Sequence, residues 1–344
     1  MEELTGLTSY ISINLYMKEI DIRPKEIFSK YRKLSKEDAL DNFPSAARKE
    51  INCIACDSKK LEPQFEKHGF KYSMCLECGS LFHSPRADLN AFDNFYKNSK
   101  SSIFWATEFF PSVMDARREL VFAPKAKEIL SKTQELNIDI DKIADIGAGY
   151  GIFLEEWKKI SNTKTLTAIE PSSEMADICR SKGFDVYELM VEDINKKINA
   201  NLTVCFEVLE HAHDPFQFIM SLKNVMHSNG YLLLTTLSVD GFDIQQLWSH
   251  SDQISPPHHI NFLSIQGFEL MFARAGFDIV EISTPGKLDV DIVMNSDYFP
   301  ETELSSSKLF KQILLDESKR KSFQQYLSDN LMSSHIWVLA KLRN

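Results

Sequence analysis

The sequence predicts an α/β fold in which a doubly wound, mostly parallel sheet follows a small cysteine-bearing unit and a helical N-terminal region. Two observations support this prediction. From residue 143 onward, short apolar runs typical of strands alternate with segments of helical period, as a doubly wound sheet requires. Ahead of that point, four cysteines stand in two C-x2-C pairs, which favours a compact metal-binding unit in a reducing compartment.

Four segments differ in pattern. Residues 1–50 carry intermittent apolar positions among mixed charges, which is typical of short helices. Residues 51–87 contain the paired cysteines. Residues 88–136 are helical in period and strongly aromatic at first, so we expect a lid or connector there, with plain core packing as the alternative. Residues 137–344 hold the alternating pattern, with a mostly helical insertion at about 286–333.

The alternating region resolves into seven strands and at least four helices. The predicted strands span residues 143–147, 166–170, 185–189, 202–207, 230–237, 277–284 and 335–340. The predicted helices span residues 151–160, 173–182, 215–227 and 265–275. The helical insertion joins the last two strands.

Charge and hydropathy exclude several classes of protein. The 344 residues are enough for one large domain with additions, or for two domains. The net charge of −10 includes no run of lysines and arginines, so a nucleic-acid partner is disfavoured. No segment reaches the ~18 apolar residues of a membrane span, and no secretory signal precedes the fold. We therefore expect a cytoplasmic protein with a small-molecule substrate and no membrane partner; the oligomeric state is not determined by composition.

A glycine-rich stretch follows the first predicted strand of the sheet. Asp145 ends the apolar run, and Gly147, Gly149 and Gly151 follow at alternate positions. Glycine allows the chain to turn sharply and to pass close to a ligand, as a strand-to-helix cofactor loop requires. A dinucleotide loop reads G-x-G-x-x-G and would need a glycine where Ile152 stands. The pattern D-x-G-x-G-x-G instead resembles motif I of the class I S-adenosylmethionine (SAM) methyltransferases.

Acidic residues after the next strands extend this resemblance. Glu170 ends the second predicted strand, where a carboxylate can accept hydrogen bonds from both ribose hydroxyls of an adenosine-bearing ligand. Glu192 and Asp193 follow the third strand, where an acid of the family meets the adenine amine; an acid that starts a helix accounts for them equally well.

The fourth strand carries the most specific segment. Residues 205–215 read Cys-Phe-Glu-Val-Leu-Glu-His-Ala-His-Asp-Pro, which closely resembles the E-V-L-E-H…D-P segment of the branch that includes the ubiquinone-biosynthesis O-methyltransferases. The resemblance implies SAM as the cofactor and a Rossmann-like, seven-stranded methyltransferase sheet whose last strand is antiparallel beside the fifth. It also implies that Glu207 contacts the amino end of the cofactor.

Two kinds of catalytic group are consistent with the histidines. Methyl transfer to oxygen or nitrogen often needs a base that removes the acceptor's proton. His258 or His259 is the favoured base and His211 is a further candidate, while a structural hydrogen bond closing the loop is the alternative. Glu207, Glu210 and His211, together with one of the distal histidines, also resemble the divalent-metal site of small-RNA 3′-end 2′-O-methyltransferases. Two carboxylates and two imidazoles suit Mn²⁺ or Mg²⁺-like chemistry.

The four paired cysteines predict a structural zinc site. Cys53, Cys56, Cys75 and Cys78 give the spacing C-x2-C-x18-C-x2-C, and four thiolates suit tetrahedral Zn²⁺ with no open position for catalysis. The unit resembles the zinc ribbons that precede the methyltransferase domain in several bacterial sugar-modifying enzymes and in one group of ribosomal-RNA methyltransferases.

The sequence therefore predicts a SAM-dependent methyltransferase that acts on an oxygen or nitrogen of a small polar metabolite. A nucleotide-linked or surface-glycan sugar is the preferred acceptor. An RNA 2′-O- or base methyltransferase is one alternative, and a SAM-fold binding protein without activity is another.

Overall fold

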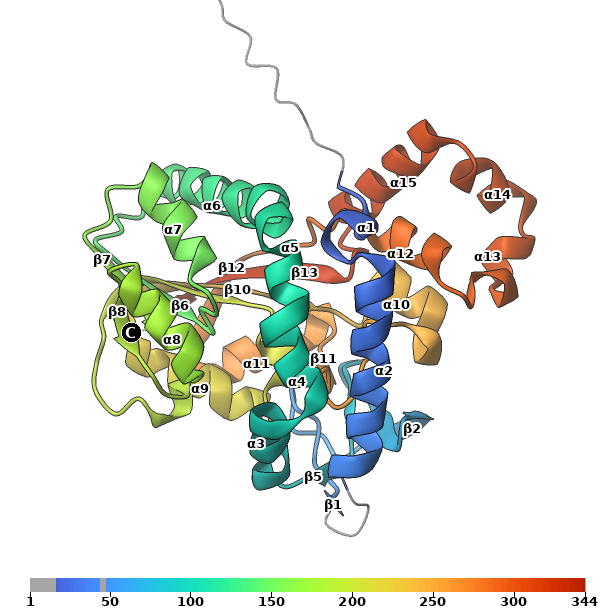
Figure 1. The fold of residues 1–344 in the computed structure, drawn as a ribbon, viewed down its shortest axis with the longest axis horizontal. Coiled ribbons are helices and arrows are strands. Elements are labelled where there is room, and N and C mark those ends of the chain that lie inside the picture. Colours follow the sequence, from blue (N-terminus) through green and yellow to red (C-terminus); the bar gives the residue numbers. More distant parts are fainter. Residues whose placement is uncertain (1–16, 44–47, 344) are drawn as a thin grey trace, which may run out of the picture.

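A seven-stranded mixed sheet organises the chain, which we describe from a computed structural model covering residues 17–43 and 48–343 (Figure 1). The strand order is β12-β13-β10-β9-β6-β7-β8. Strand β13 is antiparallel to β10 and β12, whereas the other neighbours are parallel. The predicted fold, including the final strand beside the fifth, is confirmed. The strands are β6 (Lys142–Ile146), β7 (Thr165–Ile169), β8 (Asp185–Tyr187), β9 (Ala200–Phe206), β10 (Met226–Leu237), β12 (Phe277–Ser283) and β13 (His335–Leu342).

Helices cover both faces of this sheet because successive strand residues point to opposite sides. Ile143 packs with the helices of one face and Ala144 with those of the other. The first face is covered by α6 (Ala123–Glu135), α7 (Ile152–Ile160) and α8 (Ser173–Ser181), with Trp157 fully buried at its centre. The second face is covered by α9 (Pro215–Val225) and α11 (Ile265–Ala275).

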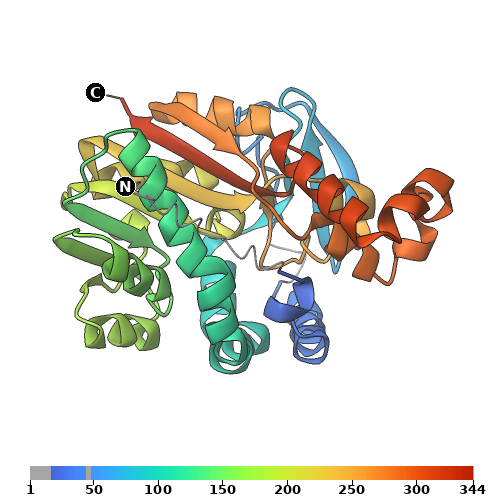
Figure 2. The ribbon, with the colours of Figure 1, turned by 90° about the horizontal axis from the view of Figure 1, so that it is seen from above.

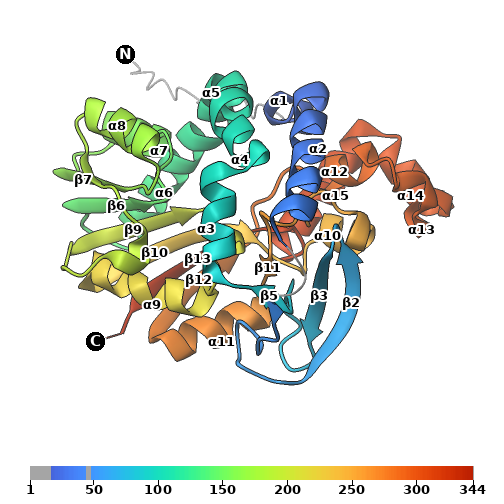
Figure 3. The same ribbon diagram turned by 60° about the horizontal axis from the view of Figure 1, so that its bottom comes forward.

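The N-terminal region is helical and stands beside the carboxyl ends of the strands (Figure 3). Its helices are α1 (Glu19–Ile22), α2 (Lys25–Asn42), α3 (Leu89–Asn98), α4 (Lys100–Phe104) and α5 (Phe110–Arg117). From α4 to α6 the chain is helical throughout, with π-helical turns at Trp105–Phe109 and Arg118–Phe122. Such turns are rare and frequently occur at functional sites. Residues 1–16 and 44–47 of the predicted helical extension lie outside the described residues.

The cysteine-bearing segment forms a sheet of its own, in the order β11-β4-β3-β2. Strands β2 (Leu61–Lys67), β3 (Phe70–Cys75) and β4 (Leu81–His83) come from this segment, whereas β11 (Asn261–Phe262) comes from the region after residue 137 that forms the large sheet. A separate two-stranded sheet pairs β1 (Arg48–Lys49) with β5 (Arg86–Ala87) in antiparallel fashion. The cysteine unit is thus joined by strand pairing to the segment that contains His258 and His259.

The insertion before the last strand is helical and projects from one end of the molecule, in orange to red in Figure 2. It comprises α12 (Asp289–Asn295), α13 (Glu303–Ser306), α14 (Lys308–Leu314) and α15 (Glu317–Asp329). Its apolar side chains share a cluster with Phe242 and Leu247 of α10 (Phe242–Leu247). None of the helices in the part of the chain that is described has the length and apolar character needed to cross a membrane.

Candidate active site

The glycine loop joins β6 to α7, at the carboxyl ends of the parallel strands. Gly147, Gly149 and Gly151 all have positive φ, at 69°, 53° and 68°. A Cβ at Gly147 would lie 2.8 Å from Cγ2 of Val208, whereas a Cβ at Gly149 would meet nothing within 4 Å. The backbone at Gly149 therefore borders open space, which is where a ligand can approach most closely.

The acidic residues predicted to bind the cofactor divide into two groups. Glu170 is buried at the end of β7 and accepts hydrogen bonds from the backbone N–H groups of Gly149 (2.8 Å) and Ser172 (2.9 Å). Burial raises its pKa, and burial followed by the charge of Glu170 raises the pKa of Asp145 well above the usual range. These two residues meet at the glycine loop. Glu192 and Asp193 lie apart, exposed in the 3-10 turn Val191–Asp193 after β8.

Glu207 occupies a strained position immediately after β9. Its φ of 55° is left-handed, which is uncommon for a residue other than glycine and often marks a functional site. Its Oε1 accepts a hydrogen bond from Oγ1 of Thr235 at 2.6 Å and lies 3.3 Å from Nδ1 of His335. The side chain remains 41% exposed. Although burial raises its pKa, the charges of His335 and Lys125 and the Thr235 hydrogen bond outweigh that effect and lower it.

Three predicted residues converge beside Glu207. One ligand atom from each of Glu210, His211 and His259 lies within 4.8 Å of the others, and Glu207 is outside this group. Nδ1 of His211 lies 2.9 Å from the backbone oxygen of His258, and Nδ1 of His259 lies 2.6 Å from that of Gln253. A carbonyl oxygen only accepts, so each Nδ1 carries the proton and each Nε2 keeps a free lone pair.

The electrostatics of this group keep its members uncharged. Burial, followed by the charge of Glu207, raises the pKa of Glu210 to about 8. Burial and the neighbouring His259 lower the pKa of His211 to about 3, and burial lowers that of His259 to about 4. Both imidazoles are neutral at pH 7, so the lone pair of each Nε2 is available to a proton or a cation. A pKa this low also makes each ring a weaker base than a free imidazole.

His258 occupies a different environment from its neighbour. It is 5% exposed, its Nε2 lies 3.1 Å from Oγ of Ser101, and its ring packs against Tyr31 and Phe95. Its backbone oxygen accepts from Nδ1 of His211, as noted above. The side chain is enclosed by the N-terminal helices, whereas His211 and His259 are only half-buried.

The aromatic segment packs over the glycine loop. The rings of Phe110 and Tyr150 are parallel within 2° with centroids 5.2 Å apart, and the Tyr150 hydroxyl donates to the backbone oxygen of Ala106. Trp105 stacks on Phe109 at 4.5 Å. The first π-helical turn thus lies against the loop that is expected to hold the cofactor.

Sequence reasoning missed two polar residues of this site. Lys125 is buried, donates to Oγ1 of Thr235 (3.3 Å) and lies 4.3 Å from the centre of the Phe206 ring. His335 begins β13 and contacts Glu207. In the sequence, Lys125 has the appearance of a solvated helix position and His335 that of a strand start. No local signal distinguishes either from an ordinary surface residue.

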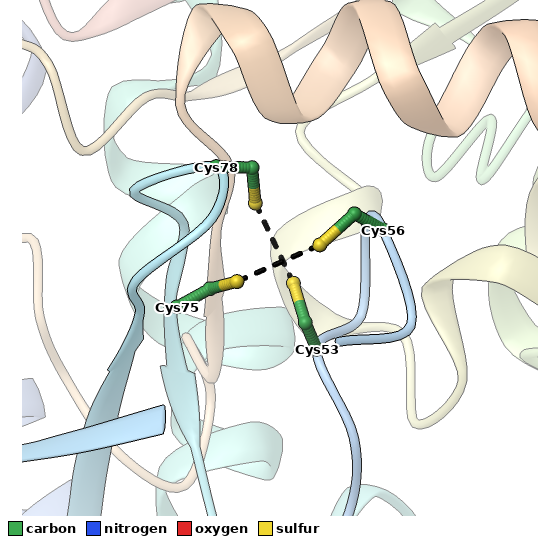
Figure 4. A group of neighbouring side chains, drawn as sticks. All are labelled: Cys53, Cys56, Cys75 and Cys78. Atoms are coloured by element: carbon green, nitrogen blue, oxygen red, sulfur yellow. Dashed lines mark hydrogen bonds between the residues drawn. The ribbon is translucent and has the colours of Figure 1, made fainter. Parts of the chain in front are cut away.

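The four paired cysteines gather at one point, as Figure 4 shows. The Sγ atoms of Cys53 and Cys78 are 3.5 Å apart, as are those of Cys56 and Cys75, and all four ligand atoms lie within 4.8 Å. Tetrahedral zinc with Zn–S bonds of 2.3 Å places its sulfurs about 3.8 Å apart, so this donor set fits Zn²⁺.

Both cysteine knuckles dock on helix α11. Oγ of Ser264, which caps this helix, donates to the backbone oxygen of Cys78, and Arg274 donates to that of Ala55. A Cβ at Gly267 would lie 2.2 Å from Oγ of Ser80, so the second knuckle sits directly on the helix.

A comparison with protein families matches residues 113–282 to the family described as "Methyltransferase domain". This match, the sheet order and the glycine loop agree. The segment is therefore a class I SAM-dependent methyltransferase domain, and the resemblance drawn from the sequence is confirmed.

Individual curated relatives match only part of the chain, at low sequence identity. The chain is 28% identical over 148 residues to a tRNA U34 carboxymethyltransferase of Azotobacter vinelandii, covering 40% of this chain and 45% of the relative. It is 28% identical over 109 residues to a ubiquinone biosynthesis O-methyltransferase of Actinobacillus pleuropneumoniae, covering 28% and 46%. The chain thus spans about half the length of these curated relatives. A solved plantazolicin methyltransferase in complex with SAH is 10% identical, with a TM-score of 0.48 over 74% of this chain and 94% of that one.

Proposed function

We propose that this protein binds SAM at the carboxyl ends of β6, β7 and β9 and transfers its methyl group to an oxygen or nitrogen of a small polar acceptor. The contact between the N–H of Gly149 and Glu170 carries this proposal, because it unites the open glycine backbone with the acid expected at the ribose. Glu192 or Asp193 would face the adenine, and Glu207 the amino end. SAM supplies an electrophilic methyl group, and the chain's own residues hold and orient it.

Binding of S-adenosylhomocysteine (SAH) tests the donor site. We expect Glu170→Gln to weaken SAH binding about tenfold, because hydrogen bonds to a charged acceptor are lost. Glu174→Gln is the matched control, since Glu174 is exposed on α8 and nearby in sequence. If the unchanged protein shows no calorimetric binding of SAH, the proposal is wrong and a SAM-fold binding protein without activity becomes the leading account.

For the acceptor, we propose His259 as the base, with His211 beside it. Nε2 of His259 is free because Nδ1 is held by Gln253, and the ring is half-buried beside Glu207, so it can take the proton of an acceptor hydroxyl or amine. His258 would hold the loop, since Ser101 and aromatic rings enclose it. His259→Ala should abolish methyl transfer while SAH affinity is retained. Equal turnover in the His259→Ala and unchanged proteins would transfer the role to His211 or remove the need for a base.

A divalent cation is the second use we propose for the same atoms. Glu210, His211 and His259 would supply one oxygen and two nitrogens, with Glu207 available at the exposed side, and such an ion would orient an acceptor hydroxyl and lower its pKa. Electron paramagnetic resonance of added Mn²⁺ tests this on protein whose cysteine site is loaded with zinc. A Mn²⁺ signal that is identical in the unchanged and Glu210→Gln proteins excludes the site.

A tritiated-methyl screen against nucleotide sugars and total RNA tests the identity of the acceptor. A nucleotide-linked or surface-glycan sugar is our proposal, although the relatives named above concern tRNA and ubiquinone biosynthesis. The tRNA-modifying relative favours RNA as the second candidate, against the net charge of −10. A salt-sensitive gel shift with total RNA would support it, and no RNA binding at low salt would exclude it.

A further inference from the structure

Arg117 is the last residue of α5, and among the described residues its guanidinium has no hydrogen-bond acceptor. Its Nε is buried. Its Cζ lies 5.5 Å from the ring centres of both Trp105 and Phe110, so two aromatic faces contact the cation. The adjacent Arg118 differs: it pairs with Glu155 (2.9 Å) and Glu156 (2.6 Å) on α7. A half-buried guanidinium whose enclosed Nε lacks an acceptor loses hydration without compensation, and an anionic partner at its accessible N–H groups would offset that cost.

A second arginine faces the same region. Arg23 follows α1, which packs against α5, and its Nη2 donates to Oε1 of Gln253 at 3.4 Å. Burial, followed by the charge of Arg23, lowers the pKa of Arg117 to about 10. The charge of Arg23 also contributes to lowering the pKa of His259. The charge of Arg23 therefore acts on both Arg117 and the proposed base, His259.

The negative charges around the two arginines are too weakly placed to neutralise them. Glu19 lies 3.8 Å from Arg23, at the outer limit of an ion pair. Glu207 acts on Arg117 only through the electrostatic effect of its charge, because its carboxylate accepts a hydrogen bond from Thr235 and lies 3.3 Å from Nδ1 of His335. Arg117 itself is half-buried although its Nε is enclosed, so the remaining N–H groups of the fork stay accessible.

We propose that Arg117 and Arg23 bind an anionic group of the methyl acceptor, either a phosphate or a carboxylate. The planar guanidinium presents two parallel N–H groups that match such oxygens in bidentate fashion, and the rings of Trp105 and Phe110 fix its plane. With the anionic group held there, the acceptor atom would face His259 and Glu207. This inference rests on the proposed function, because it names the chemical class of the acceptor for the same site.

Calorimetry with two small anions tests the inference on the full, zinc-loaded chain saturated with SAH. We expect inorganic phosphate, acetate or both to bind at a single site. Arg117→Gln should weaken this binding about tenfold or more, as loss of a charged hydrogen bond does, and Arg117→Lys should weaken it less. Arg343→Gln is the matched control, since Arg343 is an exposed arginine that pairs with Asp278 on the far edge of the sheet. The anion that binds distinguishes a phosphorylated from a carboxylated acceptor.

Any of three results would overturn the inference. In the first, neither anion binds the SAH complex. In the second, Arg117→Gln binds the anion as tightly as the unchanged protein does. In the third, Arg117→Gln loses as much SAH affinity as anion affinity, because Arg117 would then bind the carboxylate of the methyl donor. Failure of the proposed function is separate: the unchanged protein would not bind SAH, and the anion titration, repeated on the zinc-loaded chain without SAH, would still report on the arginine pair.

Discussion

Asp243 and Asp289 form a buried carboxyl pair that should make stability depend on pH. Asp243 lies in α10 with no exposed surface, and no described residue lies within hydrogen-bond geometry of either of its carboxyl oxygens. Burial, followed by the charge of Asp289, raises its pKa well above the usual range. Asp289 begins α12 and accepts from Oγ of Ser333 (2.5 Å) and from the backbone N–H of Ser334 (2.7 Å). The pair therefore joins the helical insertion to the sheet domain.

The sign of the pH effect follows from the raised pKa. An unfolded aspartate releases its proton near pH 3.9, while folded Asp243 keeps it to a higher pH. The site's contribution to stability is therefore complete below about pH 4 and is lost as the pH rises toward the folded pKa. Between the two pKa values the loss is about 1.4 kcal/mol for each pH unit. Asp243→Asn carries no titrating proton, and its amide can donate to Asp289.

Urea unfolding at pH 5, 6 and 7 measures this difference. The free energy of unfolding of Asp243→Asn should fall less steeply with pH than that of the unchanged protein, by about 1.4 kcal/mol per unit while Asp243 remains protonated. Asp185→Asn is the control, because Asp185 is exposed at the start of β8. Parallel slopes for the unchanged and Asp243→Asn proteins would refute the raised pKa.

Two further predictions concern the loop and the cysteines. Gly147→Ala should lower the free energy of unfolding by about 2–5 kcal/mol, because the new Cβ adds contact with Val208 to the strain of a left-handed backbone. Gly149→Ala should lower it by about 1–2 kcal/mol, from that strain alone. Equal losses in urea unfolding would contradict the contact geometry. Elemental analysis should find about one zinc per chain. Cys75→Ser should lose the zinc and become less soluble. Its SAH affinity should be nearly unchanged, because the cysteine unit lies apart from the glycine loop. Metal-free protein that folds normally would contradict the zinc prediction.

The sheet could be predicted because its signals are local. Strands such as β9 and β13 contain apolar runs that are recognisable in the sequence alone, and the three glycines mark positions where φ is positive in the structure. The four cysteines likewise carry their spacing in the sequence. The strained φ of Glu207, by contrast, is imposed by the surrounding packing, and the residue type gives no sign of it.

The polar residues around the acceptor side could not be predicted, because their partners are distant in sequence. Arg23 and Gln253 are 230 residues apart, and Lys125 and Thr235 are 110 apart. A lysine or arginine in a helical segment has the pattern of a solvated position until the fold shows what covers it. The same reason hides β11, whose two residues pair with β4 only after the chain has brought them together.

The pairing of β11 with β4 changes how the cysteine unit relates to the histidines. The Tyr72 hydroxyl donates to the backbone oxygen of His259 at 2.7 Å, and the N–H of His83 donates to that of Ile260 at 2.9 Å. On the other side, the N–H of Ile260 donates to the backbone oxygen of Glu210 at 2.9 Å. The segment that bears His259 is thus fixed between the cysteine unit and the end of β9. Because the glycine loop shares none of these contacts, disturbing the cysteine unit should act on the acceptor side and spare the donor side.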